Sequence, residues 1–131
     1  MKKRILIVDD EPEFTGMLKL TLETHGYFEC QEENDAENVR AAAREFGPDV
    51  ILLDIMMPQL DGSEVAAGLK QDPLLKDVPV IFLTALVSRA DAPLGSCSSG
   101  GQTFLPKDIR VDKLIRCIEE KTARQHAVAA H

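Results

Sequence analysis

Five polar residues closely follow short apolar runs, and their types suit the binding of a hard divalent cation. They are Asp9, Asp10, Asp54, Thr84 and Lys107. Three carboxylates that lie close together repel one another unless a cation lies between them or some are protonated. A set of oxygen ligands without His or Cys suits Mg²⁺, or alternatively Mn²⁺. The sequence therefore predicts a metal site if the fold brings these residues together.

The apolar runs themselves predict the sheet that would do this. Residues 5–8, 50–53 and 80–83 are unbroken apolar stretches, which are typical of strands buried on both faces of a parallel sheet. Residues 28–31 alternate between apolar and polar, as in a half-exposed edge strand, and residues 103–105 form a short fifth strand. We therefore expect a doubly wound α/β fold, (βα)5 and flavodoxin-like, and we assume the strand order 2-1-3-4-5. Ligands bind such sheets at the carboxyl ends of the strands.

Segments with helical spacing separate the strands. The first helix begins near Asp10 and Pro12 and stops at Gly26, with one face expected to point inward. That face comprises Phe14, Met17, Leu18, Leu22 and His25. The second helix is expected to follow Asn34, whose side chain would form a capping box of the N-x-x-E type with Glu37.

Further helices are expected over residues 63–71 and 111–124. Residues 88–101 should hold one more, but they are rich in Gly, Ser and Pro. That composition has low helix propensity and predicts a short or frayed helix. We therefore assign residues 1–124 to one domain and residues 125–131 to a C-terminal tail or the start of a linker.

Composition narrows the functional classes. The 131 residues carry 15 Lys and Arg against 22 Asp and Glu, a net charge of −7. Such a balance, without clustered basic residues, disfavours direct nucleic acid binding. Three widely spaced cysteines indicate neither a disulfide framework nor a zinc site. Because no apolar stretch is long enough to span a bilayer, we expect no membrane association and a cytoplasmic location.

In four segments the chain resembles the receiver domain of two-component response regulators, of the chemotaxis-regulator type. The resemblance covers about residues 3–120. The segments are 7–11 (IVDDE), 53–62 (LDIMMPQLDG), 83–85 (LTA) and 100–107 (GGQTFLPK). It implies a cytoplasmic signalling switch that takes a phosphoryl group onto Asp54 from a sensor histidine kinase or phosphotransfer protein. The switch would then act on an unknown downstream partner or output domain.

The same resemblance implies a role for each site residue. Asp10 and Asp54 would coordinate Mg²⁺ directly, the backbone carbonyl of Met56 would be a further ligand, and Asp9 would act through a bound water. Thr84 and Lys107 would contact the phosphoryl oxygens. Thr84 and Phe104 would form the switch, with Phe104 turning inward as Thr84 moves.

Departures from the family pattern add expectations of their own. Asp108 follows Lys107 where similar proteins have proline, so the usual cis peptide bond should be missing. Met56 and Leu86 occupy the positions that border the path of the attacking water in similar proteins. Because both are apolar, we expect autodephosphorylation to be slow. The resemblance itself implies a chain that catalyses only its own phosphotransfer and autodephosphorylation, not the turnover of a metabolite.

Other classes remain as alternatives. A flavodoxin-like flavin site would need a loop of Ser, Thr and Gly after the first strand, where Asp9 and Asp10 would repel a phosphate. A phosphatase with an aspartyl nucleophile would place a second Asp where this chain has Met56. A P-loop is absent from the sequence. The main alternative is a receiver-like binding module that acts without phosphorylation.

Overall fold

A parallel sheet forms the centre of the computed structural model, which describes residues 2–26, 28–55, 62–85, 97–99 and 102–129. Five of its strands are parallel and lie in the order β2-β1-β3-β4-β6. Their bounds are β1 (Lys3–Val8), β2 (Phe28–Glu33), β3 (Val50–Asp54), β4 (Val80–Thr84) and β6 (Gln102–Pro106). The predicted order 2-1-3-4-5 is confirmed, with β6 as the predicted fifth strand.

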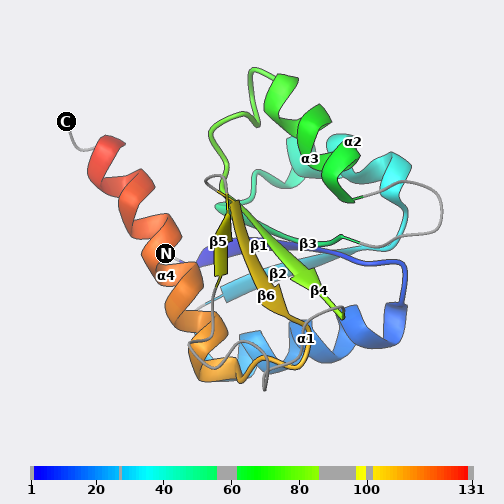
Figure 1. The fold of residues 1–131 in the computed structure, drawn as a ribbon, viewed down its shortest axis with the longest axis vertical. Coiled ribbons are helices and arrows are strands. Elements are labelled where there is room, and N and C mark those ends of the chain that lie inside the picture. Colours follow the sequence, from blue (N-terminus) through cyan, green and yellow to red (C-terminus); the bar gives the residue numbers. More distant parts are fainter. Residues whose placement is uncertain (1, 27, 56–61, 86–96, 100–101, 130–131) are drawn as a thin grey trace.

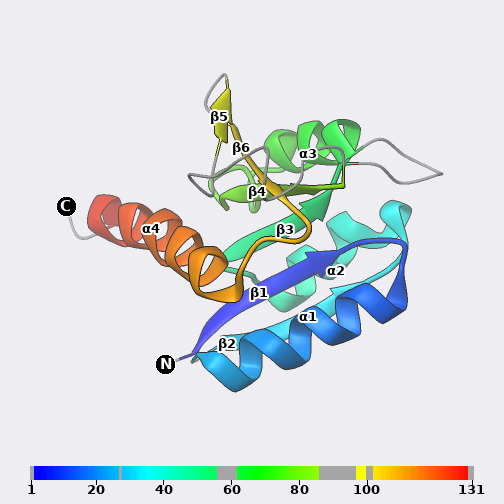
Figure 2. The ribbon, with the colours of Figure 1, turned by 60° about the horizontal axis from the view of Figure 1, so that its bottom comes forward.

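Helices cover both faces of this sheet. They are α1 (Pro12–His25), the 3-10 helix η1 (Ala36–Asn38), α2 (Val39–Phe46), α3 (Gly62–Gln71) and α4 (Val111–Ala129). Figure 1 shows α2 and α3 on one side of the strands and α1 on the other, and Figure 2 shows α4 on the same side as α1. The predicted α/β layers, with helices on both faces of a parallel sheet, are therefore observed.

Two apolar clusters fill the space between the sheet and its helices. Alternate residues of the strands point to opposite faces. Ile5, Ile7 and Leu52 pack with α1 and α4, whereas Leu6 and Leu53 pack with α2 and α3. The central strands are fully buried, which explains why their sequences are unbroken apolar runs.

Two residues predicted to face the core on α1 do not. Met17 is 57% exposed and His25 is also exposed. The buried face of α1 instead follows Leu18 and Leu22, with Phe14 partly buried. His25 lies in the last turn, where its Nδ1 is 2.9 Å from the Thr21 carbonyl oxygen. The helix is docked along a single narrow stripe, so residues at its margins face solvent.

The predicted cap of the second helical segment was also wrong. Asp35, not Asn34, caps η1, because its carboxylate accepts the Glu37 backbone N–H at 3.0 Å. α2 then continues from Val39, and Gly47 ends it with a left-handed φ of 66°. Asn34 is therefore free to make other contacts, which lie beside the candidate site.

A sixth strand replaces part of the helix expected over residues 88–101. β5 (Cys97–Ser99) pairs antiparallel with β6, with Ser99 opposite Gln102. Gly100 and Gly101 separate these two residues in the sequence, and Gly-Gly is a typical two-residue hairpin sequence. Residues 88–96 and 100–101 of the predicted helix lie outside the described part of the chain.

The last helix is longer than predicted. α4 runs to Ala129, five residues beyond the predicted end at residue 124, and its C-terminal turns extend past the sheet (Figure 2). The tail predicted for residues 125–131 is therefore helical as far as Ala129, while the domain boundary itself stays a prediction. Within the described ranges there is no cis peptide bond, and none of the helices there has the length and hydropathy to cross a membrane.

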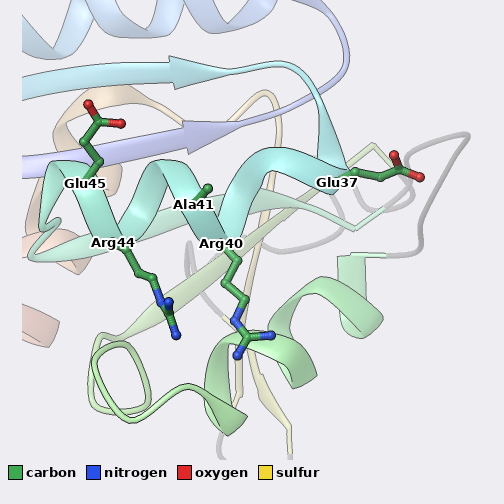
Figure 3. Close-up of a pocket in the computed structure, with 5 residues that line it drawn as sticks. All are labelled: Glu37, Arg40, Ala41, Arg44 and Glu45. Carbon is green, nitrogen blue, oxygen red and sulfur yellow. The ribbon is translucent and has the colours of Figure 1, made fainter.

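A buried carboxylate ties α2 to the loop after α3. Oδ2 of Asp72 lies 2.6 Å from Nε of Arg44 and 3.1 Å from Nε of Arg40. Both arginines project from α2 toward α3 (Figure 3). The Asp72 side chain is fully buried, and the two arginine side chains that pair with it are themselves half-exposed. The hydrogen bond from Arg44, with smaller contributions from the Leu74 N–H and Arg40, outweighs burial and lowers the pKa of Asp72 to about 2.

Asp72→Asn should therefore lower the urea midpoint of unfolding at pH 7. Because the folded pKa is depressed, the carboxylate's contribution is present above the ordinary value of 3.8 and is lost as the pH falls toward about 2. The gap between wild type and variant should accordingly shrink as the pH falls below about 4. Asp112→Asn is the control, because Asp112 pairs with Arg110 at the exposed surface. Equal midpoints for wild type and Asp72→Asn at pH 7 would contradict the assignment.

Candidate functional site

The predicted site residues meet at the carboxyl edge of the parallel strands. Asp9 directly follows β1, and Asp54 ends the neighbouring strand β3, whose Leu53 lies opposite Val8. Thr84 ends β4. Lys107 directly follows β6, and its backbone N–H donates to the Thr84 carbonyl at 2.9 Å. Adjacent parallel strands thus place residues that are far apart in the sequence side by side.

Three carboxylates form one cluster at this edge. Asp9, Asp10 and Asp54 each offer an oxygen atom, and these atoms all lie within 4.8 Å of one another. Asp9 and Asp54 are buried, whereas Asp10 is half-buried. The donor set fits a hard divalent cation, because Mg²⁺ binds oxygen ligands and keeps several waters. The sequence-based expectation that these side chains converge is confirmed by their positions.

Lys107 brings a single ammonium group to the cluster. Its Nζ lies 2.6 Å from Oδ2 of Asp9, 3.4 Å from Oδ2 of Asp54 and 3.7 Å from Oε1 of the exposed Glu11. One ammonium cannot neutralise three carboxylates, and the cluster retains an excess of negative charge.

Burial and pairing shift the ionisation of this pair. Burial raises the pKa of Asp9 above its ordinary value, and the charge of Asp54 adds to the rise, while Lys107 and the Glu11 N–H oppose it. Burial alone would lower the pKa of Lys107, but its contacts with Asp9 and Asp54 outweigh burial and raise that pKa. Lys107 is therefore fully charged at neutral pH.

Thr84 and Phe104 lie on the adjacent strands β4 and β6. Thr84 is buried, and its neighbour Leu83 lies opposite Asp54 in the ladder between β3 and β4. The partly buried Phe104 is opposite Phe82, and the two rings stack with centroids 5.0 Å apart. Phe104 thus packs against the core on β4, as an ordinary apolar residue would. Met56 and Leu86 lie outside the described residues.

Three contacts at the site were not predicted from the sequence. Nζ of Lys107 lies 4.9 Å from the centroid of the Phe14 ring, at the distance of a cation–π contact. Glu11 reaches the same ammonium. Asn34 donates its amide to the backbone carbonyl of Asp9 at 2.8 Å. Helical spacing had indicated that Phe14 points inward, but no pattern showed which charged group it meets.

The excess negative charge predicts that Asp10→Asn stabilises the metal-free protein. Removing one of three close carboxylates relieves repulsion on the order of 1–3 kcal/mol. The gain in unfolding free energy should shrink when MgCl₂ is added, because a cation stabilises the wild-type site. Urea unfolding with and without MgCl₂ measures both effects. Glu13→Gln is the control, since Glu13 lies in the first turn of α1 outside the cluster. A gain equal to that of the control would show that the carboxylates do not interact.

A family model supports the resemblance seen in the sequence. The model described as the response regulator receiver domain matches residues 5–119. Protein PilH of Pseudomonas aeruginosa is 39% identical over 117 residues, which cover 88% of this chain and 93% of PilH. The chemotaxis protein CheY4 of Vibrio cholerae has a similar solved structure, with a TM-score of 0.75 and 26% identity. That match covers 92% of this chain and 98% of CheY4.

Other relatives are longer than this chain. The DNA-binding dual master transcriptional regulator RpaA of Synechocystis is 35% identical over 131 residues, covering 98% of this chain but 54% of RpaA. The chain thus spans about half the length of that relative. The DNA binding named for RpaA is therefore not assigned to this chain.

Proposed function

Because this chain belongs to the response regulator receiver domain family, we propose that it is a phosphoacceptor of a two-component phosphorelay, with Asp54 as the accepting residue. Receiver domains are signalling switches that interact with histidine kinases and output domains, and they bind Mg²⁺ at an acidic pocket. The observation that carries the proposal is the position of Lys107, whose ammonium lies within 3.4 Å of both Asp9 and Asp54. A buried acceptor carboxylate beside a fixed cation suits phosphoryl transfer.

In this proposal an oxygen of Asp54 attacks the phosphorus atom of the donor. The bond from phosphorus to the imidazole nitrogen of a phosphohistidine breaks, and the imidazole leaves with the electron pair. Lys107 then contacts a phosphoryl oxygen, for which it must give up part of its pairing with Asp54. Positioning and charge neutralisation are the main contributions to such a transfer, so a preorganised ammonium is valuable.

The acidic cluster supplies the other half of the charge balance. Asp10 and Asp54 would hold Mg²⁺ directly, Asp9 through a water, and the Met56 carbonyl would be a further ligand. When bound, Mg²⁺ neutralises charge on the phosphoryl oxygens. Mn²⁺ has the same preference for oxygen ligands and is the alternative ion. The donor chemistry of Asp9, Asp10 and Asp54 supports this assignment.

The switch part of the proposal involves Thr84 and Phe104. The Thr84 hydroxyl would donate to a phosphoryl oxygen on Asp54. Phe104 would change its packing in response, which requires its stack on Phe82 to slide or break. Slow autodephosphorylation stays part of the proposal, because the apolar Met56 and Leu86 cannot orient an attacking water by hydrogen bonding.

Partners and location follow from the same assignment. We propose a sensor histidine kinase or phosphotransfer protein as donor, an unknown downstream partner or output domain, and a cytoplasmic location without membrane association. Relatives such as RpaA are named as DNA-binding regulators. The net charge of −7 argues against direct nucleic acid binding by the residues of this chain. A binding module that acts without phosphorylation is disfavoured, because a complete set of Asp9, Asp10, Asp54, Thr84 and Lys107 would have no use in it.

Incubation with MgCl₂ and a small phosphodonor, followed by mass spectrometry, tests the proposal. The wild type should gain one phosphoryl group, located on Asp54 after proteolysis, and Asp54→Asn should gain none. Asp49→Asn is the matched control, because Asp49 lies just before β3 and accepts the Arg4 N–H far from the cluster. Following the loss of the group over time measures autodephosphorylation. Equal phosphate uptake by wild type and Asp54→Asn would refute Asp54 as the acceptor.

A further inference from the structure

Both backbone polar groups of Asp9, the N–H and the carbonyl, form hydrogen bonds with residues at the end of β2. Its N–H donates to the Glu33 carbonyl at 3.2 Å. Its carbonyl accepts the side-chain amide of Asn34 at 2.8 Å. The second bond continues the ladder between β1 and β2 by one step after β2 has ended. A planar peptide bond links this carbonyl to Asp10, so the orientation of that peptide is fixed at the point where the chain enters the carboxylate cluster.

Asn34 is itself held by a chain of hydrogen bonds. Its Nδ2 also donates to Oγ1 of Thr15 at 3.0 Å. The Thr15 hydroxyl lies 2.6 Å from Oε1 of Glu32 and 3.2 Å from the Pro12 carbonyl. A hydroxyl has one proton, and the shorter contact with a carboxylate takes it. The order of donation is therefore Asn34 to Thr15 to Glu32.

This chain of hydrogen bonds has a defined direction, and its central hydroxyl is shielded from water. Thr15 is fully buried, and Asn34 and Glu32 are half-buried. The Asp9 carbonyl can only accept, so the amide nitrogen of Asn34 must face it, and the second amide hydrogen then points to Thr15. A hydroxyl that donates to a carboxylate is a better acceptor, so each bond strengthens the next.

We propose that Asn34 is a positioning residue, held by Thr15 and Glu32, that fixes the Asp9–Asp10 peptide and thereby sets the two carboxylates for the cation. The inference rests on the proposed function for the identity of the cation, and on the hydrogen bonds alone for the role of Asn34. Groups that orient metal ligands from outside commonly change metal affinity when they are removed.

An NMR titration with MgCl₂ is the first measurement. Asn34→Ala should bind Mg²⁺ about tenfold more weakly than wild type. Asn38→Ala is the matched control, because Asn38 is the same residue type four positions away and bonds the Glu33 side chain instead of Asp9. Amide hydrogen exchange of Glu11 is the second measurement, since the Glu11 N–H donates to Oδ1 of Asp9 at 3.0 Å. That exchange should be faster in Asn34→Ala and unchanged in Asn38→Ala.

A second pair of variants keeps the test sharp if Asn34→Ala does not fold. Thr15→Val removes the hydroxyl with little change of shape and should weaken Mg²⁺ binding and speed Glu11 exchange. Thr15→Ser keeps the hydroxyl and should retain wild-type behaviour in both. Wild-type affinity and exchange in Asn34→Ala, or in Thr15→Val where Asn34→Ala does not fold, would overturn the inference. So would equal losses in Asn34→Ala and Asn38→Ala. Failure of Asp54 to accept phosphate would instead refute the proposed function, while Glu11 exchange would still decide the role of Asn34.

Discussion

Lys107→Met should destabilise the metal-free protein by roughly 3 kcal/mol at neutral pH, because it leaves a buried charge without its partner. Asp9 is 1% exposed, and its Oδ2 lies 2.6 Å from the Lys107 ammonium. Without that ammonium, Asp9 and Asp54 are two buried carboxylates with no cation between them. The variant should also take up phosphate on Asp54 far more slowly than wild type. Urea unfolding and the phosphodonor assay measure these two effects.

Two further variants isolate the cause. Lys70→Met removes an exposed ammonium that lies 3.5 Å from the Lys76 carbonyl oxygen, and it should change the unfolding free energy by less than about 0.5 kcal/mol. Adding Asp9→Asn to Lys107→Met removes the uncompensated carboxylate and should recover much of the lost stability. If Lys107→Met unfolds at the same urea concentration as Lys70→Met, the ion pair with Asp9 does not contribute to stability.

Gly62→Ala should strongly destabilise the protein. A Cβ at this position would lie 2.6 Å from Cα of Ile55 and would also meet the Asp54 carbonyl oxygen. Both are backbone atoms, which cannot move aside as a flexible side chain can. Gly62 also donates its N–H to the Ile55 carbonyl at 3.0 Å, which ties the start of α3 to the end of β3. We expect a loss of about 1–3 kcal/mol and slower phosphate uptake, because the backbone of Asp54 must shift.

Gly68→Ala provides a matched comparison in the same helix. A Cβ there would meet nothing within 4 Å. Replacing a helical glycine by alanine at such an open position should stabilise the protein by about 0.5–1 kcal/mol. The two substitutions add the same methyl group to α3 and should therefore change stability in opposite directions. If Gly62→Ala also raises the urea midpoint, the close approach to Ile55 is not rigid.

The parallel strands could be predicted because strands buried on both faces appear in the sequence as unbroken apolar runs, whereas the order 2-1-3-4-5 was assumed. A short apolar run such as residues 50–53, with turn-forming residues before and after it, is typical of a buried strand. The convergence of Asp9, Asp54 and Lys107 follows from the same reasoning, since carboxyl ends of parallel strands share one edge. The carboxylate cluster therefore required no knowledge of side-chain packing.

Contacts that depend on one side chain choosing among several partners could not be predicted. Asn34 has the right type and spacing for a helix cap, but the cap is Asp35, and Asn34 bonds the Asp9 carbonyl. Nothing local distinguishes the two, because both offer similar short polar side chains. Likewise, the low helix propensity of residues 88–101 indicated a frayed helix. Cys97–Ser99 instead forms an antiparallel strand that pairs with β6. That strand depends on a tertiary partner.

The backbone hydrogen bond from the Lys107 N–H to the Thr84 carbonyl couples two parts of the site. It joins the segment that carries the Thr84 hydroxyl to the segment that carries the Lys107 ammonium. In the proposed switch, a shift of one backbone segment would strain this bond, so we expect the two segments to move together.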